Sequence, residues 1–170
     1  MKKELIYSLK LMEGRMKNLY TAYYQSPIGV ILIQGNEGGI SYIKFLEEGK
    51  ENDEKLPNPM LECLNQLDEY FNGKRKEFKL KLISNGTEFQ KKVWNALTSV
   101  SYGTTASYKD IAEKINNPKA VRAVGGANNK NPHSIIVPCH RIIGSNGDLV
   151  GYGGELWRKQ WLLDFEKKNL

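Results

Sequence analysis

Residues 107–128, SYKDIAEKINNPKAVRAVGGAN, read as two short helices separated by a turn, and this pair decides the fold of the C-terminal half. Ser107 and Asp110 have the spacing of a capping box at the start of the first helix. Asn117 and Pro118 break the pattern and predict the cap and first position of a second helix. The length and the turn are those of a helix-turn-helix, and equally those of a plain helical hairpin packed in a core.

The second predicted helix, residues 119–127, combines positive charge with small side chains. Gly125 and Gly126 each cost about 1 kcal/mol relative to alanine inside a helix, which is tolerated where something approaches the backbone closely. A small-faced basic helix suits a groove with phosphate walls, whereas a hairpin packed in the core would use the same glycines for helix–helix contact. The charged residues within positions 116–131 are Lys119, Arg122 and Lys130.

A second stretch, residues 135–141 (IIVPCHR), places a cysteine between an apolar run and a histidine. The apolar run 135–137 predicts a buried strand. Pro138 predicts a helical turn, in which backbone N–H dipoles would favour a Cys139 thiolate. If the strand continued instead, Cys139 and His140 would point to opposite faces. The pattern therefore leaves open a direct pair, a water relay and a buried structural cysteine.

The N-terminal half has the pattern of a small α/β unit. Residues 19–45 predict an antiparallel three-strand meander broken by two glycine-containing turns. Asn58 and Pro59 predict the cap and first position of a helix that Gly73 ends. Apolar side chains alternate over residues 78–82 and predict one more strand.

A domain boundary is expected at Ser84-Asn85-Gly86. It divides the chain into an N-terminal α/β domain over residues 1–84 and a C-terminal domain over residues 85–170. A capping-box pattern follows the boundary, and beyond it strand signals nearly vanish. The predicted fold class is α+β, with a small antiparallel-sheet α/β domain followed by a mainly helical domain that contains the helix-turn-helix.

Both ends of the chain predict helices. Apolar residues recur at steps of three and four over residues 1–17, and a longer helix is predicted over residues 155–169. Most apolar side chains of the last helix are expected in the core. Lys159 and Glu166 share one of its faces, and Glu166 either orients a histidine or is a solvated surface residue.

Composition excludes several classes of protein. The chain has 170 residues and a net charge of +6, which favours a polyanionic partner. Two cysteines, Cys63 and Cys139, exclude a disulfide scaffold, and no paired-ligand spacing predicts a zinc site. No apolar run approaches the ~18 residues of a membrane span, and no P-loop is present. The sequence carries no targeting signal, so we expect a cytoplasmic protein without a membrane partner.

The C-terminal half resembles the 6-O-alkylguanine-DNA alkyltransferases, also called methylated-DNA-protein-cysteine methyltransferases. The resemblance is dense over residues 87–168 and holds over residues 18–82 only in outline. It implies a ribonuclease H-like N-terminal domain and a winged-helix-like DNA-binding and alkyl-acceptor domain. The motifs that carry it are Pro138-Cys139-His140-Arg141, Asn131-Pro132, Gly151-Tyr152-Gly153-Gly154, Arg122-Ala123-Val124-Gly125-Gly126-Ala127 and Trp161-Leu162-Leu163.

The resemblance implies a DNA repair protein. Such a protein binds duplex DNA, flips 6-O-alkylguanine out of the stack and transfers the alkyl group irreversibly to Cys139, so that one molecule repairs one lesion. A thiolate is a soft nucleophile, which suits attack on an sp³ carbon. The resemblance implies no cofactor, no metal and a monomer. The zinc ligands found in the N-terminal domain of some members are absent, as is the extra N-terminal domain of relatives that regulate transcription.

The same resemblance implies roles for individual residues of the catalytic group. Cys139 is expected to accept the alkyl group, with His140 as its base through a bridging water and Glu166 holding His140. Tyr108 is expected to donate a proton to the leaving guanine. Asn131 is expected to link the recognition helix to the active-site segment.

Further roles concern DNA and the lesion. Arg122 is expected to fill the gap that the flipped base leaves. Gly153 stands where some members have serine, so its contact with the base would come from the backbone alone. The remaining expected DNA-binding residues are Ser107, Lys119, Ala120, Ala123, Gly125 and Ala127. The expected alkylguanine pocket consists of Val137, Pro138, Tyr152, Gly153 and Lys159.

Two other functions are alternatives to alkyl transfer. A lesion-binding module of the alkyltransferase-like type lacks the acceptor cysteine, and Cys139 is present here. A thiol hydrolase would use a Cys-His-Glu triad, and the basic helix pair would then have no purpose. The resemblance favours alkyl transfer over both.

Overall fold

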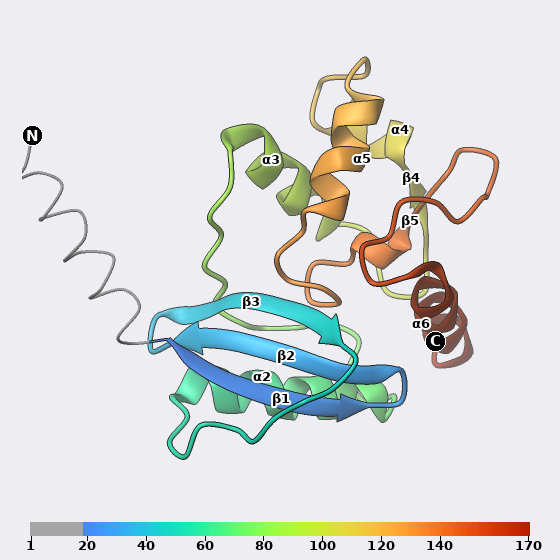
Figure 1. Ribbon diagram of the computed structural model, residues 1–170. Coiled ribbons are helices and arrows are strands. Elements are labelled where there is room, and N and C mark those ends of the chain that lie inside the picture. The colour runs from blue at the N-terminus through green and yellow to red at the C-terminus, as the bar shows by residue number, and fades with distance from the viewer. Residues whose placement is uncertain (1–18) are drawn as a thin grey trace, which may run out of the picture.

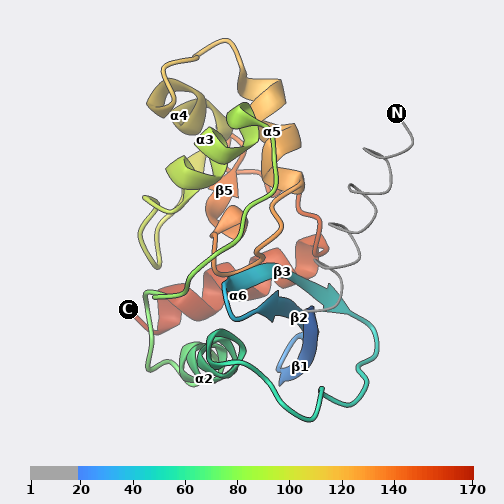
Figure 2. The same cartoon turned by 90° about the vertical axis from the view of Figure 1, so that its left-hand side faces the viewer.

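The computed structural model describes residues 19–170, so the helix predicted over residues 1–17 lies outside the described residues. A three-stranded sheet with one helix, α2, on its face forms the N-terminal part (Figure 1). Helices α3, α4 and α5 gather on the other side of the molecule. The last helix, α6, runs alongside the sheet (Figure 2).

The sheet is the predicted antiparallel meander. Its strands are β1 (Tyr20–Ser26), β2 (Gly29–Asn36) and β3 (Gly39–Leu46), in the order β1-β2-β3. Gly39 begins β3 with a φ of +140°, and a Cβ there would lie 2.4 Å from the Lys81 carbonyl oxygen. A glycine is therefore required at this turn.

Helix α2 (Asn58–Phe71) begins one residue earlier than predicted. The Pro57 carbonyl accepts the first helical hydrogen bonds, so Asn58 is already helical and caps nothing with its side chain. Gly73 ends the helix as expected, with a left-handed φ of +71° and its N–H donating to the Tyr70 carbonyl at 3.0 Å.

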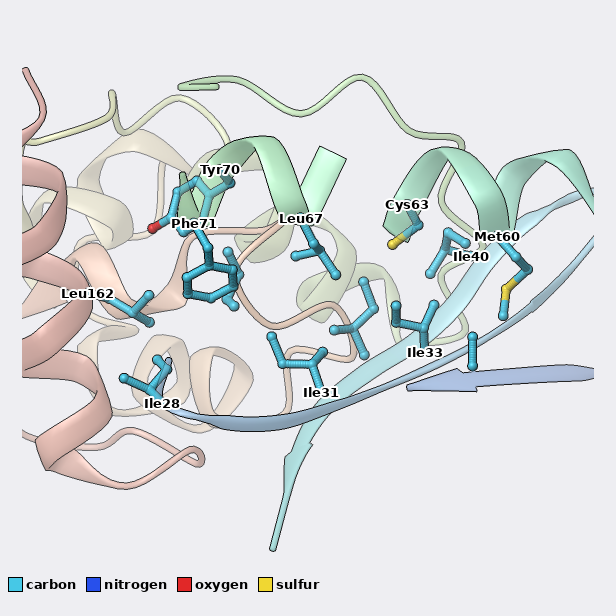
Figure 3. Packing of buried hydrophobic residues seen from close by; sticks show 13 residues of the cluster. Ile28, Ile31, Ile33, Ile40, Met60, Cys63, Leu67, Tyr70, Phe71 and Leu162 are labelled. Atoms are coloured by element: carbon cyan, nitrogen blue, oxygen red, sulfur yellow. The ribbon is translucent and has the colours of Figure 1, made fainter. Parts of the chain in front are cut away.

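The first core lies between α2 and the sheet (Figure 3). The apolar stripe of α2 packs on the inward side chains of β2 and β3. Leu162 of α6 is fully buried in the same cluster, so the last helix of the chain is held by the N-terminal core. The labelled members in Figure 3 are Ile28, Ile31, Ile33, Ile40, Met60, Cys63, Leu67, Tyr70, Phe71 and Leu162.

The extra strand predicted over residues 78–82 does not form. The segment meets β3 at a single point, where the Ile40 N–H donates to the Lys81 carbonyl at 2.8 Å. Farther along the same edge, the Ile43 N–H donates to the Pro132 carbonyl at 2.8 Å. The segments around Lys81 and Pro132 therefore share the outer edge of β3, and neither forms a full ladder with it.

The C-terminal part contains the predicted helix pair and a second core. Both predicted capping boxes form, at Thr87–Gln90 and at Ser107–Asp110. Two short parallel strands join the segment before α4 to the segment after the cysteine. The elements are α3 (Glu88–Leu97), β4 (Ala106–Ser107), α4 (Tyr108–Lys114), α5 (Val121–Asn129), the 3-10 helix η1 (Cys139–Arg141), β5 (Ile142–Ile143) and α6 (Leu156–Lys168).

Helix α5 begins at Val121 instead of residue 119. The Ala120 N–H donates to the Asn117 carbonyl at 3.0 Å, which closes a turn ahead of the helix. Asn117 and Pro118 therefore form that turn and do not cap α5, whose N-cap is Ala120. Lys119 precedes the helix.

The strand predicted over residues 135–137 is also replaced by a turn. Ile135 has a left-handed φ of +73°, and the Val137 N–H donates back to the His133 carbonyl at 2.9 Å. Pro138 follows as the N-cap of the 3-10 helix η1, so the helical turn that the sequence predicts at this proline does form. Cys139 thus sits in a helical turn and not on a strand.

The last helix also departs from expectation at its start. Leu156 and Trp157 are 47% and 51% exposed, and neither belongs to the N-terminal core. Leu162, one turn and a half later, is fully buried as expected. Within residues 19–170 no helix has the length and apolarity to span a membrane.

Candidate active site

Cys139 is the first residue of η1 and is 5% exposed. Burial raises the pKa of its thiol, and the Asn131 side chain and the Lys159 charge oppose that rise. The Asn131 amide donates to the Val137 carbonyl at 2.8 Å and so braces the turn that carries the cysteine. Asn128 donates to the Cys139 carbonyl at 3.4 Å. A raised pKa favours the protonated thiol, and attack by the thiolate then requires a base.

His140 supplies a candidate base. Its Nε2 lies 2.7 Å from Oε1 of Glu166, and both side chains are fully buried. Burial lowers the pKa of His140, although Glu166 acts in the opposite direction. A neutral ring that donates from Nε2 to the carboxylate keeps Nδ1 as an acceptor, and Nδ1 has no hydrogen-bond partner among the described residues. Of the two alternatives for Glu166, the structure shows the one that orients a histidine.

The Glu166 carboxylate is held by more donors than the sequence indicates. Arg141 donates twice, from Nε to Oε2 and from Nη2 to Oε1, both at 2.9 Å. The Gly103 N–H donates to Oε2 at 3.2 Å and the Tyr70 hydroxyl to Oε1 at 2.8 Å. Burial alone would raise the pKa of Glu166, but the hydrogen bonds and charges of His140 and Arg141 hold it far below its ordinary value.

Cys139 opens on a cavity of about 350 Å³. Tyr152 and Gly153, both predicted for the alkylguanine pocket, form one side of it, and Asn131 another. A further side comes from β3 of the N-terminal half, which sequence reasoning did not assign to the site. The lining residues from β3 and the residue after it are Tyr42, Lys44, Phe45, Leu46 and Glu47.

Val137, Pro138 and Lys159, which the resemblance places in the alkylguanine pocket, do not line this cavity. The Lys159 ammonium is buried and donates to the Ile142 carbonyl and to the Val150 carbonyl, the latter at 3.0 Å. Burial lowers the pKa of Lys159 to about 8. Pro138 faces a separate cavity of about 480 Å³.

Tyr108 also holds the loop that borders the cavity. Its hydroxyl donates to the Val150 carbonyl at 2.7 Å, and burial raises its pKa. The loop is fixed from the other side by Arg158, which sequence reasoning missed. Arg158 donates to the Ile28 carbonyl at 2.8 Å and to the Gly154 carbonyl at 3.3 Å. Its guanidinium lies 4.9 Å from the Phe45 ring centroid and 4.7 Å from that of Trp157.

The predicted DNA-binding residues fall into three groups by exposure. Arg122 and Ala123 on α5 are exposed, as are Lys119 and Lys130 at its two ends. Ala127 is turned inward, is 4% exposed and accepts a hydrogen bond from the Trp94 indole at its carbonyl. The half-buried residues are Ser107, Ala120 and Gly125.

Over residues 19–170, no three His, Cys, Asp or Glu side chains gather as they would around an ion.

The fold and the site together place a cysteine at a cavity, adjoining in the chain a buried histidine that pairs with a glutamate. Two family models match the chain. They are the 6-O-methylguanine DNA methyltransferase ribonuclease-like domain over residues 19–83 and the DNA binding domain of the same family over residues 88–168. The chain belongs to the 6-O-methylguanine DNA methyltransferase family.

Individual relatives agree with the family models. A methylated-DNA–protein-cysteine methyltransferase of Methanosarcina acetivorans is 50% identical over 155 residues, which cover 87% of this chain and 98% of the relative. The crystal structure of Mycobacterium tuberculosis O6-methylguanine methyltransferase has a TM-score of 0.81 and 40% identity, covering 89% of this chain and 94% of that one. The same organism's protein in complex with DNA gives a TM-score of 0.79 at 42% identity, covering 86% and 92%.

Proposed function

We propose that this chain is a DNA repair protein that flips 6-O-alkylguanine out of duplex DNA and transfers the alkyl group to its own Cys139. The observation that carries the proposal is the position of Cys139, at a cavity of about 350 Å³ and next to the buried His140–Glu166 pair. The names of the relatives, methylated-DNA–protein-cysteine methyltransferase, and the DNA complex of the M. tuberculosis protein support it.

The chemistry follows from the site. The thiol proton of Cys139 passes to Nδ1 of His140 through a bridging water, and Glu166 stabilises the charge that the ring gains. The sulfur attacks the alkyl carbon, the carbon–oxygen bond breaks, and its electron pair leaves with guanine. Tyr108 gives the leaving base a proton after its hydroxyl has been released from the Val150 carbonyl. The thioether product is stable, so each chain reacts once.

DNA binding is assigned to the α4–α5 pair acting as a helix-turn-helix. The exposed side chains of Arg122, Lys119 and Lys130 give this surface a positive charge without a nearby acid in residues 116–131. Arg122 enters the base stack in place of the flipped nucleotide. Asn131 follows α5 directly and braces the cysteine turn, so it couples the two parts of the site.

Three further assignments complete the proposal. The domain boundary lies at residues 84/85, which is supported by the gap between the two family matches. The protein acts as a monomer, since Cys139, His140 and Glu166 all come from one chain. It works in the cytoplasm, where free thiols such as Cys63 and Cys139 persist.

Intact-mass measurement tests the function. The protein is incubated with a duplex that carries one 6-O-methylguanine, and the matched controls are the Cys139→Ser variant and an unmodified duplex. We expect the wild-type chain to gain one methyl group in place of a hydrogen, and both controls to keep their mass. Tight binding of the lesion without any mass change would show a lesion-binding module instead.

A further inference from the structure

We propose that Tyr70, on α2 of the N-terminal half, is a positioning residue for the reaction: its hydroxyl orients the Glu166 carboxylate toward His140. The inference rests on the proposed function and assigns a part of the catalytic apparatus to the N-terminal domain. The contact joins residues 96 positions apart, and the Tyr70 hydroxyl lies 2.8 Å from Oε1 of Glu166.

The three donors that meet at this one oxygen explain why Tyr70 affects the base. Oε1 also faces Nε2 of His140 at 2.7 Å and Nη2 of Arg141 at 2.9 Å. Every donor that shares the oxygen takes part of its negative charge and fixes the direction of its lone pairs. Tyr70 therefore influences both the orientation of His140 and the strength with which its ring holds a proton.

The position of the Tyr70 hydroxyl is fixed by packing that does not involve the site. The side chain is fully buried, and Figure 3 shows its oxygen pointing from α2 toward the side on which α6 lies. Its ring meets the rings of Phe71, Phe78 and Phe165 at centroid distances of 5.1, 5.3 and 5.7 Å. The donor is thus placed by the first core, and phenylalanine at this position would keep every one of these ring contacts.

The hydroxyl acts as a donor throughout the working pH range. Burial and the neighbouring Glu166 raise the pKa of Tyr70 well above its ordinary value, so the group stays neutral. Without it, Oε1 would keep more charge and hold a proton on His140 more firmly. The charged and titratable groups around His140 and its carboxylate are Glu166 and Lys159 on α6, Arg141 and Cys139 on η1, Tyr102 after α3, and Tyr70 on α2.

The chain offers a matched control. Tyr24 on β1 also donates to a carboxylate, Oδ1 of Asp68 on α2, at 3.2 Å, but this hydrogen bond is exposed and involves neither Glu166 nor His140. Tyr70→Phe and Tyr24→Phe therefore each delete one tyrosine–carboxylate hydrogen bond, and only the first deletes it at the site.

The test measures His140 directly. The chain has two histidines, so the imidazole signals can be assigned with a His140→Gln variant and titrated by NMR in full-length wild type, Tyr70→Phe and Tyr24→Phe. The rate of methyl transfer from duplex 6-O-methylguanine is measured over the same pH series. We expect Tyr70→Phe to raise the His140 midpoint by about one pH unit, the tenfold change that one hydrogen bond to a charged group produces. The acid limb of the rate should move with it, while Tyr24→Phe leaves both in place.

Two results would overturn the assignment. An unchanged His140 midpoint in Tyr70→Phe would make Tyr70 a packing residue, even if the transfer slowed in proportion to lost stability. An equal shift in Tyr24→Phe would show a general effect of losing a tyrosine hydroxyl. A wild type that takes no methyl would refute the proposed function, yet the NMR titration would still decide the role of Tyr70.

Discussion

Replacing Glu166 by glutamine should destabilise the protein more than any other single change at the site. The carboxylate accepts five hydrogen bonds, from Tyr70, Gly103, His140 and twice from Arg141. Glutamine offers only one acceptor oxygen. Its NH₂ group would face groups that are themselves hydrogen-bond donors. The Arg141 guanidinium, whose side chain is 8% exposed, would be left without a counter-charge.

The expected magnitude follows from the burial of the pair. Removing one partner of a buried ion pair lowers the free energy of unfolding by about 3 to 5 kcal/mol. For a chain of this length that corresponds to a fall in Tm of about 6 to 20 °C. Urea denaturation at pH 7 measures it. The matched control is Glu69→Gln, which also removes a carboxylate from an arginine, Arg75 at 2.6 Å, but at the surface; its effect should be small.

The pH dependence of the Glu166→Gln effect gives a second check. The pKa of Glu166 is lowered in the folded protein. Its stabilising contribution is therefore complete above the pKa of the unfolded chain and is lost as the pH falls toward the folded value. The difference between wild type and variant should narrow below about pH 4.5. A variant as stable as wild type at pH 7, or a difference that does not change with pH, would refute the buried ionised network.

Three predictions concern the DNA-facing surface. Arg122→Ala should slow methyl transfer from duplex DNA by on the order of tenfold or more and leave the reaction with a free alkylated base unchanged. The transfer rate is measured on both substrates, and an equal loss of rate on both would reject the intercalating role. A Cβ at Gly126 would meet nothing within 4 Å, so Gly126→Ala should raise the free energy of unfolding by about 1 kcal/mol. The same change should weaken duplex binding, and unchanged binding would mean that DNA does not approach this backbone. Lys119→Ala and Lys130→Ala should each make the slope of log affinity against log salt shallower by about 0.9, because each removes one phosphate contact. A salt titration of duplex binding measures the slope, and an unchanged slope would exclude that contact.

Local signals in the sequence predicted the elements that depend on local chemistry. The capping boxes at Thr87 and Ser107 form as predicted, because each uses hydrogen bonds within one turn. The meander and the helical turn opened by Pro138 also form. The pairing of His140 with Glu166 was implied by the family resemblance, since 26 residues separate them and no periodicity connects them.

Two strands that the sequence predicts do not form. Residues 78–82 alternate like a strand, but β3 offers them one point of contact, because residues 132–134 occupy the rest of its edge. The apolar run at residues 135–137 folds as a turn, because Ile135 takes a left-handed φ and the Val137 N–H bonds back to the His133 carbonyl.

The residues that were missed belong to contacts between the two halves. Tyr70 and the β3 residues that line the cavity lie in the N-terminal half. Arg158 of the C-terminal half donates to the carbonyl of Ile28 in the N-terminal half. Each contact links positions far apart in the chain, and no local pattern reports it. A signal did exist for Tyr70, since it adjoins Phe71 on the apolar stripe of α2 with a polar group that needs a buried partner.

The central claim is tested most directly by incubating the protein with an excess of damaged duplex. The measurement is the number of methyl groups that each chain takes up and the residue that carries them. After the reaction has run to completion, peptide mass mapping should find one methyl group per chain, on the Cys139 peptide and not on that of Cys63. The quantity of repaired DNA should equal the quantity of protein. Repair of several lesions by each chain, or a methyl group found anywhere other than on Cys139, would contradict the account.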